Sequence, residues 1–151
     1  MKTDIKNLAA FLAAAIWADG EYDEAEKIVL GEIADAMELC KDSLTTETEA
    51  AIAEFQQMDE DKVNEYLIEK SAEVDEEEAP LVYMAVMQIV TTDGILAVEE
   101  VEILLSIASS LGIEESYAML LLIDLVKEEP ELELKFYTGN SFSAIIFLLR
   151  K

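Results

Sequence analysis

The sequence predicts an all-α fold, a single domain of seven or eight helices, and three observations lead to that class. Apolar residues recur at three- and four-residue spacing in successive segments, the pattern of helices that bury one face. A short acidic turn that begins Asp19-Gly20 returns in the second half of the chain as Asp93-Gly94. No segment keeps the two-residue alternation of a half-buried strand, and residues 131–136, which come closest, are few.

The offset from Asp19 to Asp93 relates more than the two turns, because it also carries Glu26 onto Glu100. Flanking apolar residues correspond in the same way: Ile16 with Val90, Val29 with Ile103, Leu30 with Leu104, Ile33 with Ile107, Met37 with Leu111 and Leu39 with Ile113. A duplicated helix-turn-helix unit explains these pairs, and no linker rich in glycine, serine or proline separates the copies. We therefore expect one domain over 1–130 built from two pseudo-symmetric helical-hairpin repeats. Repeat one spans about 5–74, repeat two about 79–128, and an extension follows over 131–151.

The first repeat opens with a helical hairpin. Its first helix, 5–18, should end at Gly20, because glycine adopts the left-handed conformation without steric cost. Asp23 and Glu26 form a capping-box pattern that starts a second helix over 24–39.

Two shorter helices should complete this half. Residues 41–45 are predicted to form a loop, and Thr46 with Glu49 would cap a helix that ends near Gln57. The acids that begin at Asp59 would lie favourably at the positive amino end of a fourth helix.

The second half should begin with a helix over 79–92, where Pro80 is tolerated in the first turn. This helix is apolar on nearly every face, which is typical of a central helix. Partner helices are expected over 97–110 and 114–127. A final helix, opened by Ser141 or Ser143, is too short to span a membrane and too apolar to remain in water. It would dock into the core, form a homodimer interface or meet a protein partner.

The charge of the chain limits its partners. Its 151 residues include 34 acidic and 10 basic side chains, a net charge of −24 that both halves share. Such a surface repels nucleic-acid phosphates and anionic lipids, so we expect no nucleic-acid partner. The expected partners are cations or basic proteins. No apolar run approaches a membrane span, and no signal-peptide pattern opens the sequence. With Cys40 as the single cysteine, these features predict a cytoplasmic protein.

The absence of histidine excludes further classes. Ordinary structural zinc sites and histidine-activated nucleophiles cannot form, and no phosphate loop or cofactor fingerprint is present. We expect no enzyme activity and no organic cofactor. Any metal would be bound by oxygen, which favours Ca²⁺, Mg²⁺ or Mn²⁺.

The acids at the two turns have a structural explanation. An aspartate before glycine, such as Asp19, commonly accepts backbone hydrogen bonds, and Glu26 is explained by its cap with Asp23. In the second copy the position of Asp23 is taken by Ala97, yet Glu100 is retained. This retention leaves room for a second function of the pair.

The functional interpretation is that the duplicated acids converge on one hard divalent cation. The predicted ligands are Asp19, Glu26, Asp93 and Glu100, with Asp23 and Glu21 as additional donors in the first copy. An EF-hand is excluded, because the sixth position counted from Asp19 is Glu24 rather than glycine.

Residues 15–27, 91–100 and 110–113 resemble the tellurite-resistance TerB family and the wider TerB-like group, which includes the amino-terminal domain of the DjlA co-chaperones. The resemblance covers about 5–125. It implies an all-helical, pseudo-two-fold fold in which the four duplicated acids are the candidate metal ligands. It also implies a cytoplasmic role in tellurite resistance or stress response, through contacts with membrane-associated and metal-handling proteins. The alternative is a plain interaction or assembly module whose acids serve as caps and solubilising charge.

Overall fold

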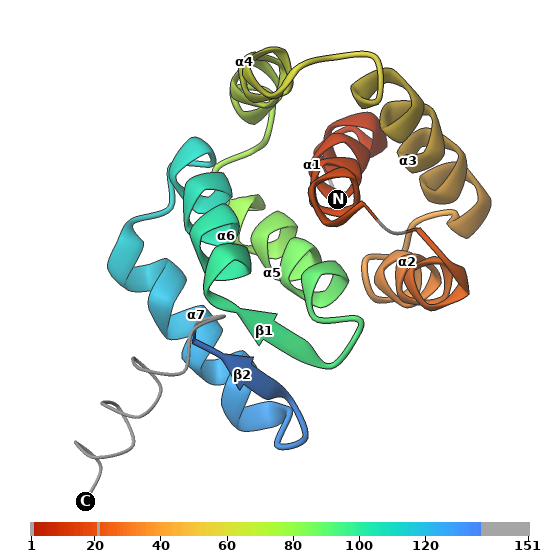
Figure 1. The fold of residues 1–151 in the computed structure, drawn as a ribbon. Helices are drawn as coiled ribbons and strands as arrows, with labels where there is room; N and C mark the ends of the chain where they lie inside the picture. Colours follow the sequence, from red (N-terminus) through yellow and green to blue (C-terminus); the bar gives the residue numbers. More distant parts are fainter. Residues whose placement is uncertain (1, 21, 137–151) are drawn as a thin grey trace, which may run out of the picture.

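The computed structural model describes residues 2–20 and 22–136. This part of the chain contains seven helices and two short strands (Figure 1). They are α1 (Ile5–Asp19), α2 (Glu24–Ala36), α3 (Lys41–Phe55), α4 (Glu60–Ser71), α5 (Ala79–Val90), β1 (Ile95–Ala97), α6 (Val98–Ser110), α7 (Glu115–Glu128) and β2 (Glu133–Lys135). The predicted all-α class is confirmed. The expected final helix lies outside the described residues.

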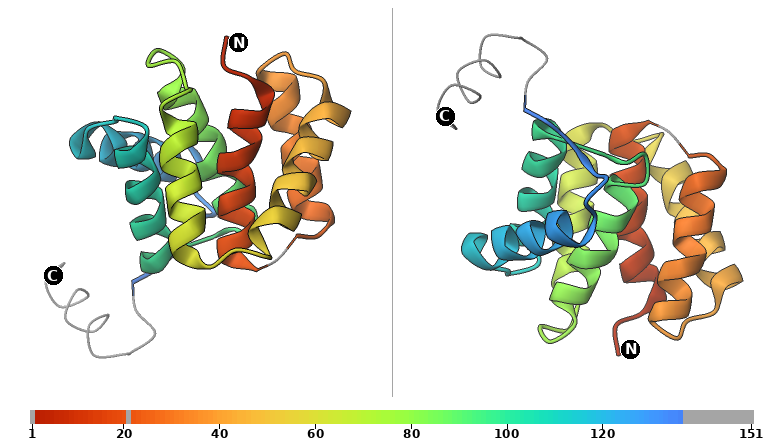
Figure 2. Two further views of the ribbon diagram at one scale, coloured as in Figure 1. Left: turned by 90° about the horizontal axis from the view of Figure 1, so that it is seen from above. Right: turned by 90° about the horizontal axis from the view of Figure 1, so that it is seen from below.

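Helix α1 is the centre of the molecule. Every residue from Asn7 to Ile16 is buried, and α1 packs against α3, α4 and α5. Figure 2 shows it enclosed between α2 and α3 on one side and α4 and α5 on the other. Helix α5 is largely buried too, but it exposes Leu81 and Met84, so α1 rather than α5 is the most enclosed helix.

The predicted loop over 41–45 is wrong, because α3 already begins at Lys41. Many residues of α3 are polar, so the helical spacing of its buried side chains is hard to recognise in the sequence. These buried side chains include Leu44, Thr48, Ile52 and Phe55. The predicted cap by Thr46 and Glu49 therefore does not form at a helix start. Glu49 instead accepts a hydrogen bond of 2.9 Å from the Tyr22 hydroxyl.

The duplication extends to three helices. The offset that carries Asp19 onto Asp93 also carries the bounds of α2 onto those of α6, and it relates α1 to α5 and α3 to α7. Helix α4 joins the two three-helix units. The left-handed residues also correspond, since Gly20 (φ +77°) matches Gly94 (φ +78°), and Glu38 (φ +57°) matches Gly112 (φ +77°).

Two short parallel strands accompany the helices, and β2 lies within residues 131–136, the segment that came closest to strand alternation. β1 pairs with β2 in the register Ile95 to Glu133, Leu96 to Leu134 and Ala97 to Lys135. The Glu133 amide also donates to the Gly94 carbonyl at 2.9 Å. Parallel strands need a crossover connection, which α6 and α7 provide. The ladder carries the chain after α7 back to the second acidic turn.

Glu78 fastens the first residues of the chain to the start of α5. Its buried carboxylate accepts hydrogen bonds from the Thr3 amide (2.6 Å), the Thr3 hydroxyl (2.7 Å) and the Lys2 amide (2.9 Å). Burial acts to raise the pKa of Glu78, but the bonds from Thr3 and Lys2 outweigh it and hold that pKa below its usual value. These hydrogen bonds join the segment before α1 to the residue that precedes α5.

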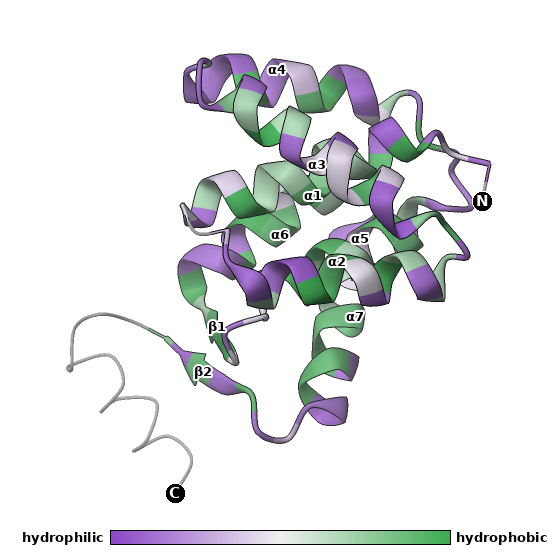
Figure 3. Cartoon of the chain, turned by 90° about the vertical axis from the view of Figure 1, so that its right-hand side faces the viewer, coloured by the Kyte–Doolittle hydropathy of each residue, from purple (hydrophilic) through white to green (hydrophobic). Residues whose placement is uncertain are grey.

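Apolar and polar residues alternate along most helices (Figure 3), and the buried apolar residues form one core cluster that includes most of α1. Exposed large apolar side chains occur on α2, α4 and α5 too, but α7 carries more of them than any other described helix: Tyr117, Met119, Leu120 and Ile123. None of the helices described has the length and the apolar character that crossing a membrane requires.

Candidate functional site

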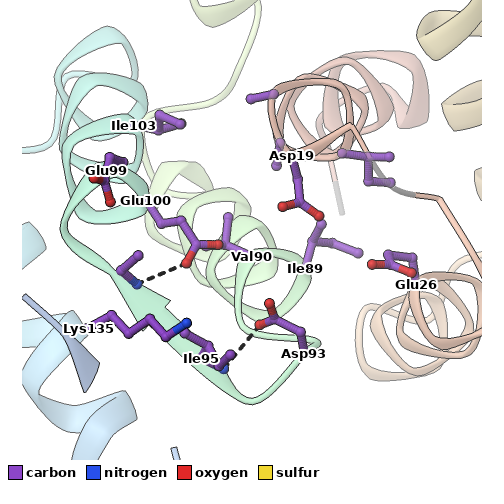
Figure 4. A pocket seen from close by; sticks show the side chains of 14 residues that line it. Asp19, Glu26, Ile89, Val90, Asp93, Ile95, Glu99, Glu100, Ile103 and Lys135 are labelled. Atoms are coloured by element: carbon purple, nitrogen blue, oxygen red, sulfur yellow. Dashed lines mark hydrogen bonds between the residues drawn. The ribbon is translucent and has the colours of Figure 1, made fainter. Parts of the chain in front are cut away.

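The four duplicated acids line one pocket. It lies where the end of α1, the start of α2, the turn after α5 and the start of α6 meet, and it has a volume of about 360 Å³. Its acidic lining residues are Asp19, Glu26, Asp93, Glu99 and Glu100. Figure 4 shows these side chains around a shared space, with Ile89, Val90 and Ile103 forming its apolar wall. The duplication thus brings residues of both repeats to one place.

Each aspartate precedes a left-handed glycine, but the two turns hold it differently. Asp19 is the last residue of α1, and Gly20 then ends the helix by donating from its amide to the Ile16 carbonyl at 2.9 Å. Asp93 stands before Gly94 and accepts a hydrogen bond of 3.0 Å from the Ile95 amide. Both aspartates are exposed. Their side chains therefore have room to change rotamer.

The two glutamates begin their helices with the same contact. Glu26 accepts from the Asp23 amide at 3.1 Å, and Asp23 accepts from the Ala25 amide at 3.0 Å, which completes the predicted capping box. Glu100 accepts from the Ala97 amide at 2.9 Å. Half of the cap therefore survives without Asp23. Each bond uses one carboxylate oxygen and leaves the second oxygen of that group outside the cap.

The acids of the two repeats repel one another. Burial raises the pKa of Asp19, and the negative charges of Asp93 and Asp23 raise it further. Burial likewise raises the pKa of Glu100 against the lowering effect of the Ala97 amide, and the charges of Asp93 and Asp19 add to the rise. Three acids from two repeats thus share one electrostatic environment in which a cation would be favourable.

Glu26 belongs to the pocket but depends mainly on its own repeat. Its side chain is buried, and burial followed by the contact with Asp23 raises its pKa. The pKa of Asp23 is lowered, first by its hydrogen bond with Glu26. Asp23 serves the cap rather than the lining of the pocket. Glu21 lies outside the described residues.

The sequence analysis did not identify two charged residues that line the pocket, Glu99 and Lys135. Glu99 is a neighbour of Glu100 in the first turn of α6. Lys135 comes from β2 and brings a positive charge to the edge of the acidic pocket (Figure 4). Its place there depends on the ladder with β1, and a strand of three residues leaves no periodicity that could have predicted it.

The donor set fits a hard divalent cation, because the acids of the pocket offer only carboxylate oxygens. Their present spacing is wider than a closed site. Among residues 2–20 and 22–136, no three acidic or cysteine side chains lie close enough together to hold one metal ion. Ligation by Asp19, Asp93 and Glu100 would therefore require the exposed aspartates to rotate into the pocket.

A comparison with known protein families assigns the fold. Residues 6–120 match the family described as "Tellurite resistance protein TerB". The matched region contains all four duplicated acids but ends before β2, so Lys135 lies beyond it. No curated protein and no solved structure matches the chain.

Proposed function

The chain belongs to the TerB family of tellurite resistance proteins, and from that premise we propose that it is a non-enzymatic, cytoplasmic module that binds a divalent cation. Asp19, Asp93 and Glu100 would supply the central ligands, and Glu26 would complete the set. The module would act in tellurite resistance or stress response through contacts with basic or membrane-associated proteins. Ca²⁺, Mg²⁺ and Mn²⁺ are the candidate ions, because all the donors are oxygens.

The observation that carries this proposal is that Asp19, Asp93 and Glu100 line one pocket. Asp19 comes from the first repeat and the other two from the second. The charge of Asp93 raises the pKa of Asp19, and the charges of Asp93 and Asp19 raise the pKa of Glu100. A pure helix cap requires no such convergence, since each cap is satisfied within its own turn. A bound divalent cation would relieve this repulsion by placing positive charge between the carboxylates.

The second candidate function is an interaction or assembly module whose acids are structural. The hydrogen bonds from the Asp23 amide to Glu26 and from the Ala97 amide to Glu100 favour it. In that case the turns would matter for stability and the net charge for solubility. The two candidates differ in whether one cation is preferred over another at constant ionic strength.

A thermal melt tests the cation site. The unaltered protein is compared with the double variant Asp19→Asn/Asp93→Asn in Ca²⁺, Mg²⁺, Mn²⁺ and Na⁺ at equal ionic strength. A matched control, Glu65→Gln/Glu69→Gln, removes the same charge from exposed positions on α4. A ligand at 100 times its Kd stabilises a one-site protein by about 2.7 kcal/mol.

In the unaltered protein and in the α4 control, we expect one divalent ion to raise the Tm more than the other ions do. The double variant should respond to all ions alike, because only screening remains. Equal responses of all three proteins to all ions would reject the site and favour the interaction module.

A further inference from the structure

Helices α6 and α7 and the β1–β2 ladder enclose a second hollow, a groove of about 440 Å³. Its wall is almost entirely apolar. The apolar residues that line it include Val101 on α6, Met119, Ile123 and Val126 on α7, Leu134 in β2 and Phe136 after it. We call this hollow the α7 groove.

The apolar side chains of the α7 groove are open to solvent. Ile123 is 51% exposed, Leu134 is 39% exposed and Met119 is 38% exposed. Figure 3 shows that the apolar colour continues along α7, away from the main core. Neighbouring exposed apolar residues of this kind usually mark a surface that another segment covers.

The sequence that follows the groove supplies a suitable segment. Phe136 is the last residue described and lines the groove itself. The next positions, 137–140, contain Gly139 and Asn140, which favour a reversal of the chain. Connections of this length are common between packed elements. A segment joined to Phe136 by such a connection could reach α7.

The same segment has the composition of a groove ligand. Residues 137–149 carry no charge. Its large apolar residues include one stripe with helical spacing, formed by Phe142, Ile145, Ile146 and Leu149. A helix over 141–149 would be about 14 Å long at about 1.5 Å per residue. It would be shorter than α7, which would lie beside it.

We infer that residues 137–151 fold back and dock this apolar stripe into the α7 groove of the same chain. This inference does not depend on the proposed cation site. The net negative charge of residues 1–136 attracts Arg150 and Lys151, although the charged residues that line the groove itself are Glu102, Lys127 and Lys135. Docking onto a second copy would bring two strongly acidic domains together, whereas the covalent link through Phe136 keeps the segment at high local concentration.

Methionine-methyl NMR on the full chain tests the groove side. Met119 lines the groove and Met84 lies on α5 outside it, and their side chains are almost equally exposed, at 38% and 39%. In the full chain, a soluble paramagnetic chelate should broaden Met119 several times less than Met84. In the variant Ile146→Ser/Leu149→Ser, Met119 should broaden as strongly as Met84. An unchanged Met84 signal shows that the variant is folded.

Limited digestion with chymotrypsin tests the segment side, since this protease can cleave after Phe142 and Phe147. The variant Ile123→Ser should raise the initial cleavage rate severalfold, because it weakens the groove. Ile28→Ser is the matched control, since Ile28 is 59% exposed and lies on α2, outside the α7 groove. It should leave the cleavage rate unchanged.

Equal broadening of Met119 and Met84 in the unaltered chain would overturn the inference, and so would equal cleavage of the Ile123→Ser and Ile28→Ser variants. Protection of Met119 that rises with protein concentration, together with a dimer in sedimentation, would also overturn it. That result would assign the groove to a second copy of the chain.

Discussion

At the residue scale, Asp19 lies in an environment that disfavours its negative charge. It stands where α1 ends and faces the charges of Asp93 and Asp23. Because its pKa is raised, its ionised form is less favourable in the folded protein than in the unfolded chain. Raised carboxylate pKa values are common at functional sites, so this penalty is in keeping with the cation site proposed above.

The first prediction is that Asp19→Asn stabilises the protein at pH 7 without divalent ions. The folded pKa lies above the usual value of 3.8, so the penalty is absent at lower pH and appears as pH rises through the range just above 3.8. The gain should be below about 1 kcal/mol, since the side chain is exposed. Urea denaturation at pH 7 and at pH 3.5 measures it. A loss of stability at pH 7 would show that Asp19 acts mainly as a structural acceptor.

At the element scale, the two repeats end their second helices with the same hydrogen bonds. After α2, Leu39 donates to the Ala34 carbonyl at 2.8 Å, and after α6, Ile113 donates to the Ala108 carbonyl at 2.9 Å. This pattern requires a left-handed residue just before the donor. The second repeat uses Gly112 there, but the first uses Glu38.

We predict that Glu38→Gly stabilises the protein by about 1 kcal/mol, because a left-handed residue with a Cβ atom is strained by roughly that amount. Gly112→Ala should cost a similar amount, since it introduces the same strain. Chemical denaturation measures both changes. Glu38→Gln is the control for charge, and it should not reproduce the gain. If it does, repulsion rather than backbone strain limits this helix end.

The sequence analysis succeeded where a helix is bounded by strong local signals. The Asp-Gly turns and the acids of the following helix starts drew attention to four residues that line one pocket, and their role as metal ligands stays a prediction. It failed at α3, because polar residues around Leu44 hid the buried stripe. Lys135 was not predictable, since its position follows from the pairing of β2 with a strand that precedes α6 and α7 in the chain.

At the scale of the whole molecule, like charges dominate the surface. The chain has a net charge of −24, yet residues 2–20 and 22–136 form only two ion pairs. These are Lys27 with Glu24 and Lys70 with Glu73, both within one turn of chain and both partly exposed. Pairs of this kind add little stability. Most acids therefore repel one another without local compensation.

We predict that sodium chloride raises the Tm by a few degrees between 10 and 300 mM, because screening shortens the range of this repulsion from about 30 Å to below about 8 Å. Potassium chloride should act equally, since screening does not distinguish monovalent ions. Calorimetry at both salts measures the effect. A Tm that is constant or falls with salt would show that screening relieves repulsion in the unfolded chain at least as much as in the folded one.

The β1–β2 ladder has a consequence for these two regions. Ala97 and Lys135 line both the acidic pocket and the α7 groove, so three rungs of backbone form the partition between a polar and an apolar compartment. An occupant that displaced this partition from one side would alter the space on the other. By thermodynamic reciprocity, whatever factor an ion imposes on the docking of residues 137–151 is the factor that docking imposes on the affinity for the ion.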